Sequence, residues 1–175
     1  MKRPNLQFSR LKITFYMSKL KNQSLDSYTD WINSINWSFF GTFTTGYSQT
    51  LSSSRRLMER THKAYKDYLG DCLFFWVAEP YELKDGYHTH GLLKVPDNMI
   101  KKNGLIETYH HKNLIDIYQR MAGGKVISND NGKLTFDKWN RIELAKFDNR
   151  KNAGKYALKY IKKSQKNRGD YDILI

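Results

Sequence analysis

Runs of apolar residues with strand-like and helix-like spacing alternate along this chain. Apolar residues from Leu51 to Leu69 keep helical spacing and Gly70 follows them, which predicts a helix over 51–69. A second helix is expected around 114–121, where Gly123 and Gly124 end it, and a third around 156–163. Strands are expected at 37–45, 72–78, 88–95, 125–128, 133–136 and 141–147.

This order of elements predicts an α+β protein, in which helices pack on a central antiparallel sheet of about five strands. A chain of 175 residues fits one domain with a sizeable core. We expect that domain at 35–166, with a polar N-terminal extension at 1–34 and a C-terminal tail at 167–175, and the segment 162–170 is polar enough to fray.

His88 and His90 are the most informative residues for chemistry. They lie two apart on an expected strand, so both side chains project to one face while Thr89 points to the other. The preceding strand ends at Glu79, and a hairpin between the two strands would bring this carboxylate close to both imidazoles. Such a set suits Mn²⁺ or Mg²⁺ and leaves positions for a substrate. The alternatives are a hydrogen-bonded surface pair of histidines and a carboxylate facing water.

The segment 156–163 carries a second candidate set. On a helix, Tyr156, Lys159, Tyr160 and Lys163 fall within an arc of about 100°, beside an apolar arc of alanine, leucine and isoleucine. A phenol could attack phosphorus, and the lysines could stabilise the phenolate or the charge of the transition state. An amphipathic helix with packed tyrosines and solvated lysines explains the same pattern.

The charge of the chain favours a polyanionic partner. Lys and Arg number 30 against 17 Asp and Glu, for a net charge of +13 and a sequence pI of about 9.7. Arg55, Arg56 and Lys162 belong to basic clusters and are candidate DNA-binding residues, although such clusters are often simply solvated. Cys72 is the single cysteine, which excludes an intramolecular disulfide and a cysteine-rich zinc site and favours a reducing cytoplasm. No apolar run is long enough to cross a membrane.

Taken together, the His-x-His strand and the later Tyr-x-x-Lys-Tyr-x-x-Lys segment resemble the HUH endonucleases, a superfamily of rolling-circle replication initiators, relaxases and single-strand transposases. The order also resembles that family, because a threonine-rich strand with Thr42 and Thr44 comes first and the tyrosines come last. The tyrosine pair is most similar to the initiators of small single-stranded DNA phages. Thr89 departs from the bulky apolar residue that usually separates the histidines.

The resemblance implies a Rep-type ferredoxin-like sandwich and a divalent ion held by Glu79, His88 and His90. It further implies that Tyr156 is the first nucleophile and forms a covalent 5′-phosphotyrosine, while a 3′ hydroxyl is released. Tyr160 is either a second nucleophile or a residue that packs or stacks on a base. Thr42 and Thr44 are expected to lie along the bound DNA.

We therefore expect a cytoplasmic, monomeric, virus- or plasmid-encoded enzyme that nicks and joins single-stranded DNA at a replication origin in a bacterial or other host cell. The chain has no phosphate-binding loop, so any helicase would be a separate partner. A transposase or relaxase would share this chemistry, but the late position of the tyrosines argues against a relaxase and their pairing favours an initiator. A non-catalytic basic nucleic-acid-binding protein is the alternative of another class.

Overall fold

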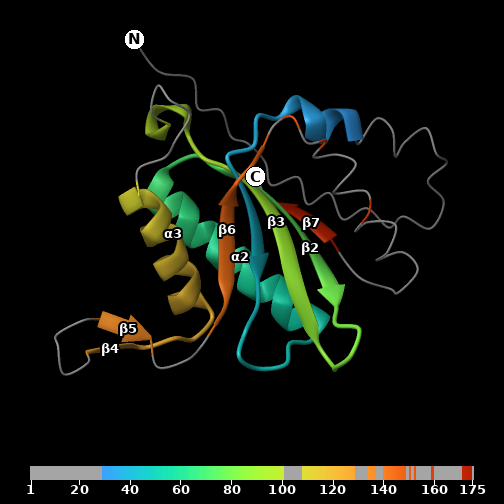
Figure 1. Cartoon of the computed structure of the whole chain (residues 1–175), viewed down its shortest axis with the longest axis vertical. Helices are drawn as coiled ribbons and strands as arrows, with labels where there is room; N and C mark the ends of the chain where they lie inside the picture. The colour runs from blue at the N-terminus through green and yellow to red at the C-terminus, as the bar shows by residue number, and fades with distance from the viewer. Residues whose placement is uncertain are drawn as a thin grey trace, which may run out of the picture.

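A five-stranded antiparallel sheet forms the centre of the structure, a computed structural model (Figure 1). Its strands follow the spatial order β6-β1-β3-β2-β7. The structure describes residues 29–100, 108–128, 134–136, 140–148, 150, 152, 159 and 171–174. The strands of the sheet are β1 (Phe39–Phe43), β2 (Leu73–Pro80), β3 (Tyr87–Lys94), β6 (Ile142–Lys146) and β7 (Tyr171–Leu174).

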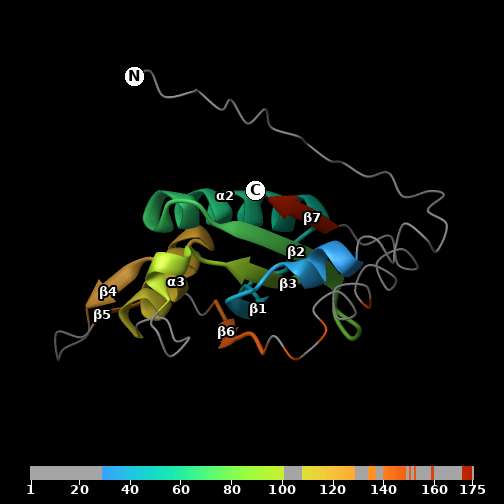
Figure 2. The same ribbon diagram turned by 90° about the horizontal axis from the view of Figure 1, so that it is seen from above.

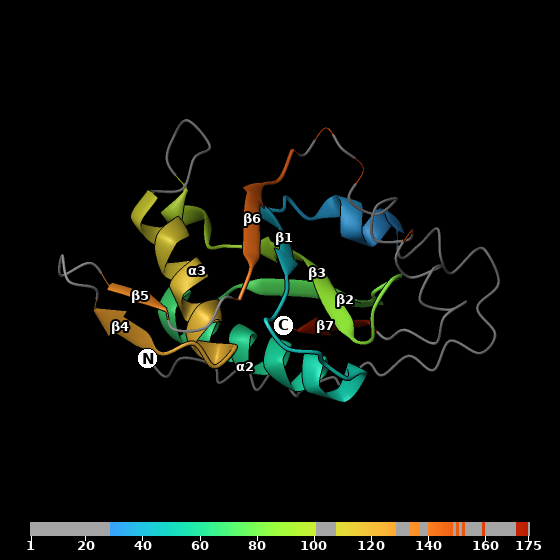
Figure 3. The same cartoon turned by 60° about the horizontal axis from the view of Figure 1, so that its bottom comes forward.

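Two helices, α2 (Leu51–Leu69) and α3 (Thr108–Met121), connect these strands, and η1 (Asp97–Met99) is a short 3₁₀ turn. The chain order β1-α2-β2-β3-α3-β6 and the strand order β6-β1-β3-β2 together define the ferredoxin-like βαββαβ arrangement. A separate hairpin of β4 (Val126–Ser128) and β5 (Leu134–Phe136) is inserted between α3 and β6 and stands apart from the central sheet (Figure 3).

Helix α2 has well-defined ends that follow from its sequence. The Thr50 side chain accepts a hydrogen bond from the Ser53 amide (3.2 Å), which satisfies one of the amides that an N-terminus leaves unpaired. At the other end, Gly70 adopts a φ of 82° and its amide donates to the Lys66 carbonyl (2.8 Å). The expected bounds of this helix are therefore confirmed.

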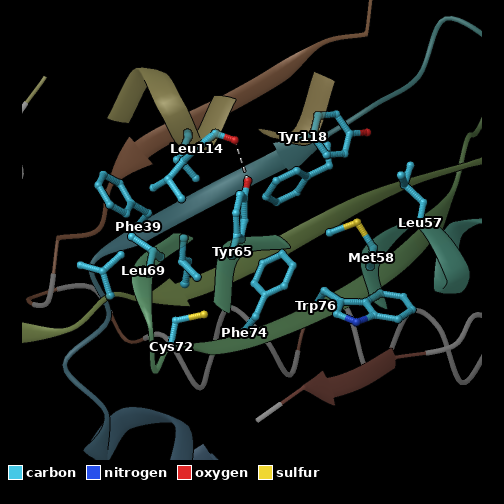
Figure 4. Packing of buried hydrophobic residues seen from close by; sticks show 14 of the residues in the cluster. Phe39, Leu57, Met58, Tyr65, Leu69, Cys72, Phe74, Trp76, Leu114 and Tyr118 are labelled. Atoms are coloured by element: carbon cyan, nitrogen blue, oxygen red, sulfur yellow. Dashed lines mark hydrogen bonds between the residues drawn. The ribbon is translucent and has the colours of Figure 1, made fainter. Parts of the chain in front are cut away.

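Both helices cover the same face of the sheet, while helical residues 29–34 lie on the opposite side (Figure 2). Tyr65 of α2 reaches α3, where its hydroxyl donates to the Leu114 carbonyl at 3.1 Å (Figure 4). The rings of Phe43, Phe74 and Tyr118 meet edge to face beneath the helices. Each large side chain buried in this way contributes roughly 1.5–3 kcal/mol of hydrophobic stabilisation.

A pair of glycines makes room for these rings at the centre of the sheet. Gly41 of β1 lies directly opposite Gly91 of β3. A Cβ on Gly91 would lie 2.8 Å from the Phe74 ring, 3.1 Å from the Phe75 carbonyl oxygen and 3.2 Å from the Phe43 ring. The glycine next to His90 is thus required by the packing of the helix-covered face.

The α+β class and the central antiparallel sheet with packed helices are confirmed. The expected C-terminal tail at 167–175 contains a strand that the sequence analysis did not predict, because Tyr171–Leu174 form β7 and pair with β2. Pairing satisfies the exposed backbone groups of that edge, but four residues at a chain end make too short an apolar run for the pattern to reveal.

The expected extension at 1–34 lies outside the described residues as far as residue 28. Residues 29–34 are helical with Ile32 fully buried, so the folded part begins before residue 35. Of the expected third helix, the structure describes Lys159 alone, which is helical and exposed. Within the described chain, no helix combines the length and the apolar character that crossing a membrane requires.

Gly91→Ala should destabilise the protein by about 1–3 kcal/mol, because the added methyl group forces the Phe74 ring and the neighbouring backbone apart. Urea unfolding of Gly91→Ala, Phe74→Leu and the double variant measures this effect. The smaller leucine should relieve part of the overlap. The losses in the free energy of unfolding of the two single variants should therefore sum to more than the loss in the double variant. Simple additivity would contradict the proposed overlap.

His62 should make the free energy of unfolding depend on pH. Its ring is buried on α2, and burial lowers its pKa, as does Lys66 more weakly, against the opposing hydrogen bond to the Cys72 carbonyl (3.3 Å). The pKa of His62 in the folded state lies below its ordinary value of 6.5. The contribution of His62 to the free energy of unfolding is therefore complete above pH 6.5, and it declines as pH falls until the folded-state histidine is itself protonated.

Urea unfolding at intervals from about pH 7.5 to about pH 5 checks the sign of this dependence. His62→Gln can keep the hydrogen bond to Cys72 but cannot titrate, so its stability should fall less over this interval. An equal decline in both proteins would show that His62 does not contribute.

Candidate metal centre

The β2–β3 hairpin places Glu79, His88 and His90 together. Glu79 pairs directly with His88, and Val77 pairs with His90, so the three side chains emerge at neighbouring positions on one face. That face is opposite the one that α2 and α3 cover. Thr89 points to the helix-covered face and is only 2% exposed, as the alternation along the strand predicts. The hairpin and its turn lie at the lower right of Figure 1.

The three potential donor atoms form a small triangle. His88 Nε2 lies 3.0 Å from His90 Nε2, and Glu79 Oε2 lies 3.4 Å from the first and 3.2 Å from the second. Two atoms each about 2.1 Å from one ion lie about 3.0 Å apart at a right angle and about 3.4 Å apart at the tetrahedral angle. All three sides fall within this interval, so the group could hold one metal ion.

The composition of this donor set would leave part of the coordination sphere of a bound ion open. Two imidazoles and one carboxylate on the same side of an ion leave its remaining positions to water or substrate, as in sites for Mn²⁺ or Fe²⁺. Glu79 is 8% exposed and both histidines are partly buried, which limits competition from bulk water.

His90 is held by two contacts with β1. Its Nδ1 lies 3.2 Å from the Thr42 hydroxyl, and its ring stacks on Phe40 with centroids 5.8 Å apart and an interplanar angle of 14°. A proton on Nδ1 that is donated to Thr42 leaves the Nε2 lone pair for a metal, which is the tautomer that coordination needs. Thr42 thus supports an imidazole that could bind a metal ion.

His88 makes its ring contact with the turn of the hairpin. Tyr81, just after β2, stacks on His88 with centroids 4.8 Å apart and an interplanar angle of 27°. The Lys84 ammonium lies 4.0 Å from the centroid of the Tyr81 ring. Each of the two imidazoles is therefore in contact with one aromatic ring.

The electrostatics favour a neutral, coordinating His90. Burial and the neighbouring His88 lower the pKa of His90 to about 4, against the opposing effect of the Glu79 carboxylate, and the Lys159 ammonium lowers it further. At neutral pH the imidazole is therefore unprotonated, which is the state that binds metals. The effect of Lys159 also shows that its charge lies within electrostatic reach of His90.

The other expected site residues are distributed as follows. Thr44 lies just after β1, two residues beyond Thr42, and its hydroxyl donates to the Arg141 carbonyl at 2.9 Å. Arg55 and Arg56 lie on α2, behind the sheet as seen from the metal ligands. The remaining expected residues lie outside the described part of the chain: Tyr156, Tyr160, Lys162 and Lys163.

Sequence reasoning missed Phe40 and Tyr81. Phe40 lies two residues before Thr42 on β1, so both side chains lie on the face that carries Glu79, His88 and His90. Nothing in the local sequence indicates which ring of β3 Phe40 contacts. Tyr81 follows Glu79 by two residues, yet it lies in a turn, where strand alternation no longer predicts direction. Both contacts depend on how separate segments pack.

Comparisons of this chain with protein-family models, with curated proteins and with solved structures found no match.

The chain should bind one Mn²⁺ ion through these residues. Replacing His88, His90 or Glu79 with alanine should weaken binding by about 100-fold or more, since loss of a ligand should cost at least as much as loss of a group that only orients one. Electron paramagnetic resonance of free Mn²⁺ in a titration measures the affinity. His110→Ala, on α3, is the matched control and should bind normally. Unchanged affinity in all three variants would refute the assignment.

Proposed function

We propose that this protein is a metal-dependent endonuclease and strand transferase of the HUH type, which nicks and joins single-stranded DNA to initiate rolling-circle replication. The observation that carries the proposal is the triangle of donor atoms from Glu79, His88 and His90. Lys159 belongs to the segment 156–163 and its charge lowers the pKa of His90, which supports the proposal that this segment acts with the metal centre.

The residues of the centre suit phosphodiester chemistry. A phosphodiester repels nucleophiles through its own negative charge, and a divalent ion bound by the three ligands would neutralise a non-bridging oxygen. The donor set is neutral but for one carboxylate, so the bound ion would keep a net positive charge toward the DNA. We propose Mn²⁺ or Mg²⁺ as that ion.

In the proposed step, the phenolic oxygen of Tyr156 forms a bond to phosphorus as the bond from phosphorus to the 3′ oxygen breaks. The phenol proton is lost, the 3′ oxygen leaves as a hydroxyl, and the 5′ phosphate stays on the tyrosine. A phenol has an ordinary pKa near 10, so nearby positive charge from Lys159 and Lys163 would favour the attacking phenolate. Attack by a 3′ hydroxyl on the phosphotyrosine reverses the reaction and joins the strands without ATP.

Single-stranded DNA at a replication origin is the proposed substrate. The net charge of +13 supports binding to a polyanion, and counterion release should supply much of the affinity. Replication initiation is favoured over transposition by the second tyrosine, Tyr160, which could cleave a new junction while Tyr156 holds the first end. A separate helicase would open the duplex.

Tyr156→Phe should abolish the covalent protein–DNA complex because it removes the attacking oxygen and little else. Tyr160→Phe should retain the complex on a simple substrate. The wild-type chain is incubated with Mn²⁺ and a library of single-stranded oligonucleotides, and adducts are resolved on a denaturing gel and located by peptide mass spectrometry.

His90→Ala serves as the metal-site control and should form no adduct while retaining much of its DNA binding. Relaxed duplex of the same sequences should give far less adduct than single strands. An adduct in the Tyr156→Phe/Tyr160→Phe variant would show that neither tyrosine is the nucleophile. DNA binding by the wild-type protein with no adduct under any condition would favour the non-catalytic alternative.

A further inference from the structure

The turn between β2 and β3 is attached directly to a metal ligand. Residues 81–86 link the strand that ends near Glu79 to the strand that begins next to His88. Within this turn, Tyr81 lies against the His88 ring at a centroid distance of 4.8 Å, and Lys84 lies 4.0 Å from the Tyr81 ring centroid. An ammonium group, a phenol ring and an imidazole are thus in successive contact.

The orientation of the His88 ring decides where its Nε2 atom lies. A histidine side chain rotates about two bonds, and only a narrow range of the second rotation brings Nε2 within 3.0 Å of His90 Nε2 and 3.4 Å of Glu79 Oε2. A ring stacked at an angle of 27° opposes that rotation, because turning the imidazole would drive its edge into the Tyr81 ring. Tyr81 therefore favours the coordinating orientation.

The turn is held by one internal hydrogen bond and by the segment that precedes α2. Within the turn, the Tyr81 amide donates to the Gly86 carbonyl (3.0 Å). From the segment before α2, the Ser48 hydroxyl donates to the Asp85 carbonyl (3.1 Å), and the Gln49 carbonyl accepts from the Tyr87 amide (3.1 Å).

Gly86 makes this close approach possible. It adopts a φ of 107°, and a Cβ there would lie 2.5 Å from the Ser48 hydroxyl oxygen. The Tyr81 backbone is thus tied to Gly86, and the adjoining residues Asp85 and Tyr87 are tied to the segment before α2. An anchored ring can orient a ligand better than a mobile one.

We propose that Tyr81 is a positioning residue that fixes the His88 imidazole for metal binding, and that it acts through its ring rather than its hydroxyl. This inference rests on the metal-binding part of the proposed function and is independent of DNA cleavage. Lys84 contributes by holding the outer side of the ring through a cation–π contact. His90 is oriented by Thr42 and Phe40, so Tyr81 completes a set in which each imidazole has its own support.

The test measures Mn²⁺ affinity of the full chain without DNA, by electron paramagnetic resonance. Tyr81→Leu should weaken binding about tenfold, the lower end of the range for groups that orient metal ligands. Tyr81→Phe keeps the ring and should bind within about twofold of the wild type. Lys84→Met should weaken binding roughly two- to fivefold. Tyr109→Leu, at a tyrosine that is 65% exposed on α3, is the matched control and should have no effect.

Visible absorption of the Co²⁺-loaded proteins gives a second readout. A changed ligand orientation should alter the band positions or intensities in Tyr81→Leu but not in Tyr81→Phe, which a loss of general stability would not do. Thermal unfolding and circular dichroism check the fold of each variant. If Tyr81→Leu does not fold, the comparison of Lys84→Met with the wild type provides the same test.

Wild-type affinity and spectrum in Tyr81→Leu, or equal losses in Tyr81→Phe and Tyr81→Leu, would overturn this proposal alone. A wild-type chain that binds no divalent ion would overturn it together with the metal centre. Metal binding that depends on Tyr81, in a protein that forms no DNA adduct, would support the positioning role while refuting the nicking activity.

Discussion

The pairing of β2 with β3 is the interaction on which both the core and the candidate metal centre depend. Its register sets Glu79 opposite His88 and Phe74 opposite Leu93. A shift by one residue would reverse the faces of every side chain on one strand, so the imidazoles would enter the core and apolar groups would face away from it. The burial of Phe74, Trp76 and Leu93 against the helices therefore stabilises the same register that assembles the three donor atoms.

One face of the sheet carries the packed core, and the other carries the candidate metal centre. On the helix-covered face, Gly41 and Gly91 admit the rings of Phe43 and Phe74, which makes close packing possible. His88 and His90 lie on the other face, partly buried beside one carboxylate. Thr89 and Gly91, which alternate with them along β3, point to the helix-covered face. A polar cluster beside such a core would destabilise the fold if its groups lacked partners, and here the imidazoles contact Glu79, Thr42 and each other.

The geometry of the centre is imposed by β1, which is distant in sequence, and by the turn of the β2–β3 hairpin itself. β1 supplies Thr42 and Phe40 to His90, and the hairpin turn supplies Tyr81 to His88. Burial and the adjacent imidazole keep His90 neutral, so a metal ion need not displace a proton at neutral pH. The three donor atoms already lie close together, which would reduce the conformational cost of binding an ion. The Lys159 charge, from the C-terminal part of the chain, also lowers the pKa of His90.

The sequence by itself determined the features that depend on local periodicity. The ends of α2 follow from helical spacing and Gly70, and the common direction of His88 and His90 follows from the two-residue repeat of a strand. The proximity of Glu79 also followed, because a short turn between two apolar strands favours a hairpin. These are properties of neighbouring residues, and tertiary packing did not change them.

Only the tertiary structure decided which rings and hydroxyl groups support the imidazoles. Thr42 and His90 are separated by 48 positions in the chain, and no local pattern indicates that β1 rather than another strand pairs with β3. For the same reason the sequence did not predict β7, because its four residues gain their strand conformation by pairing with the backbone of β2. Contacts of this kind arise from strand order and from how a turn packs, which depend on the burial of the whole core rather than on adjacent side chains.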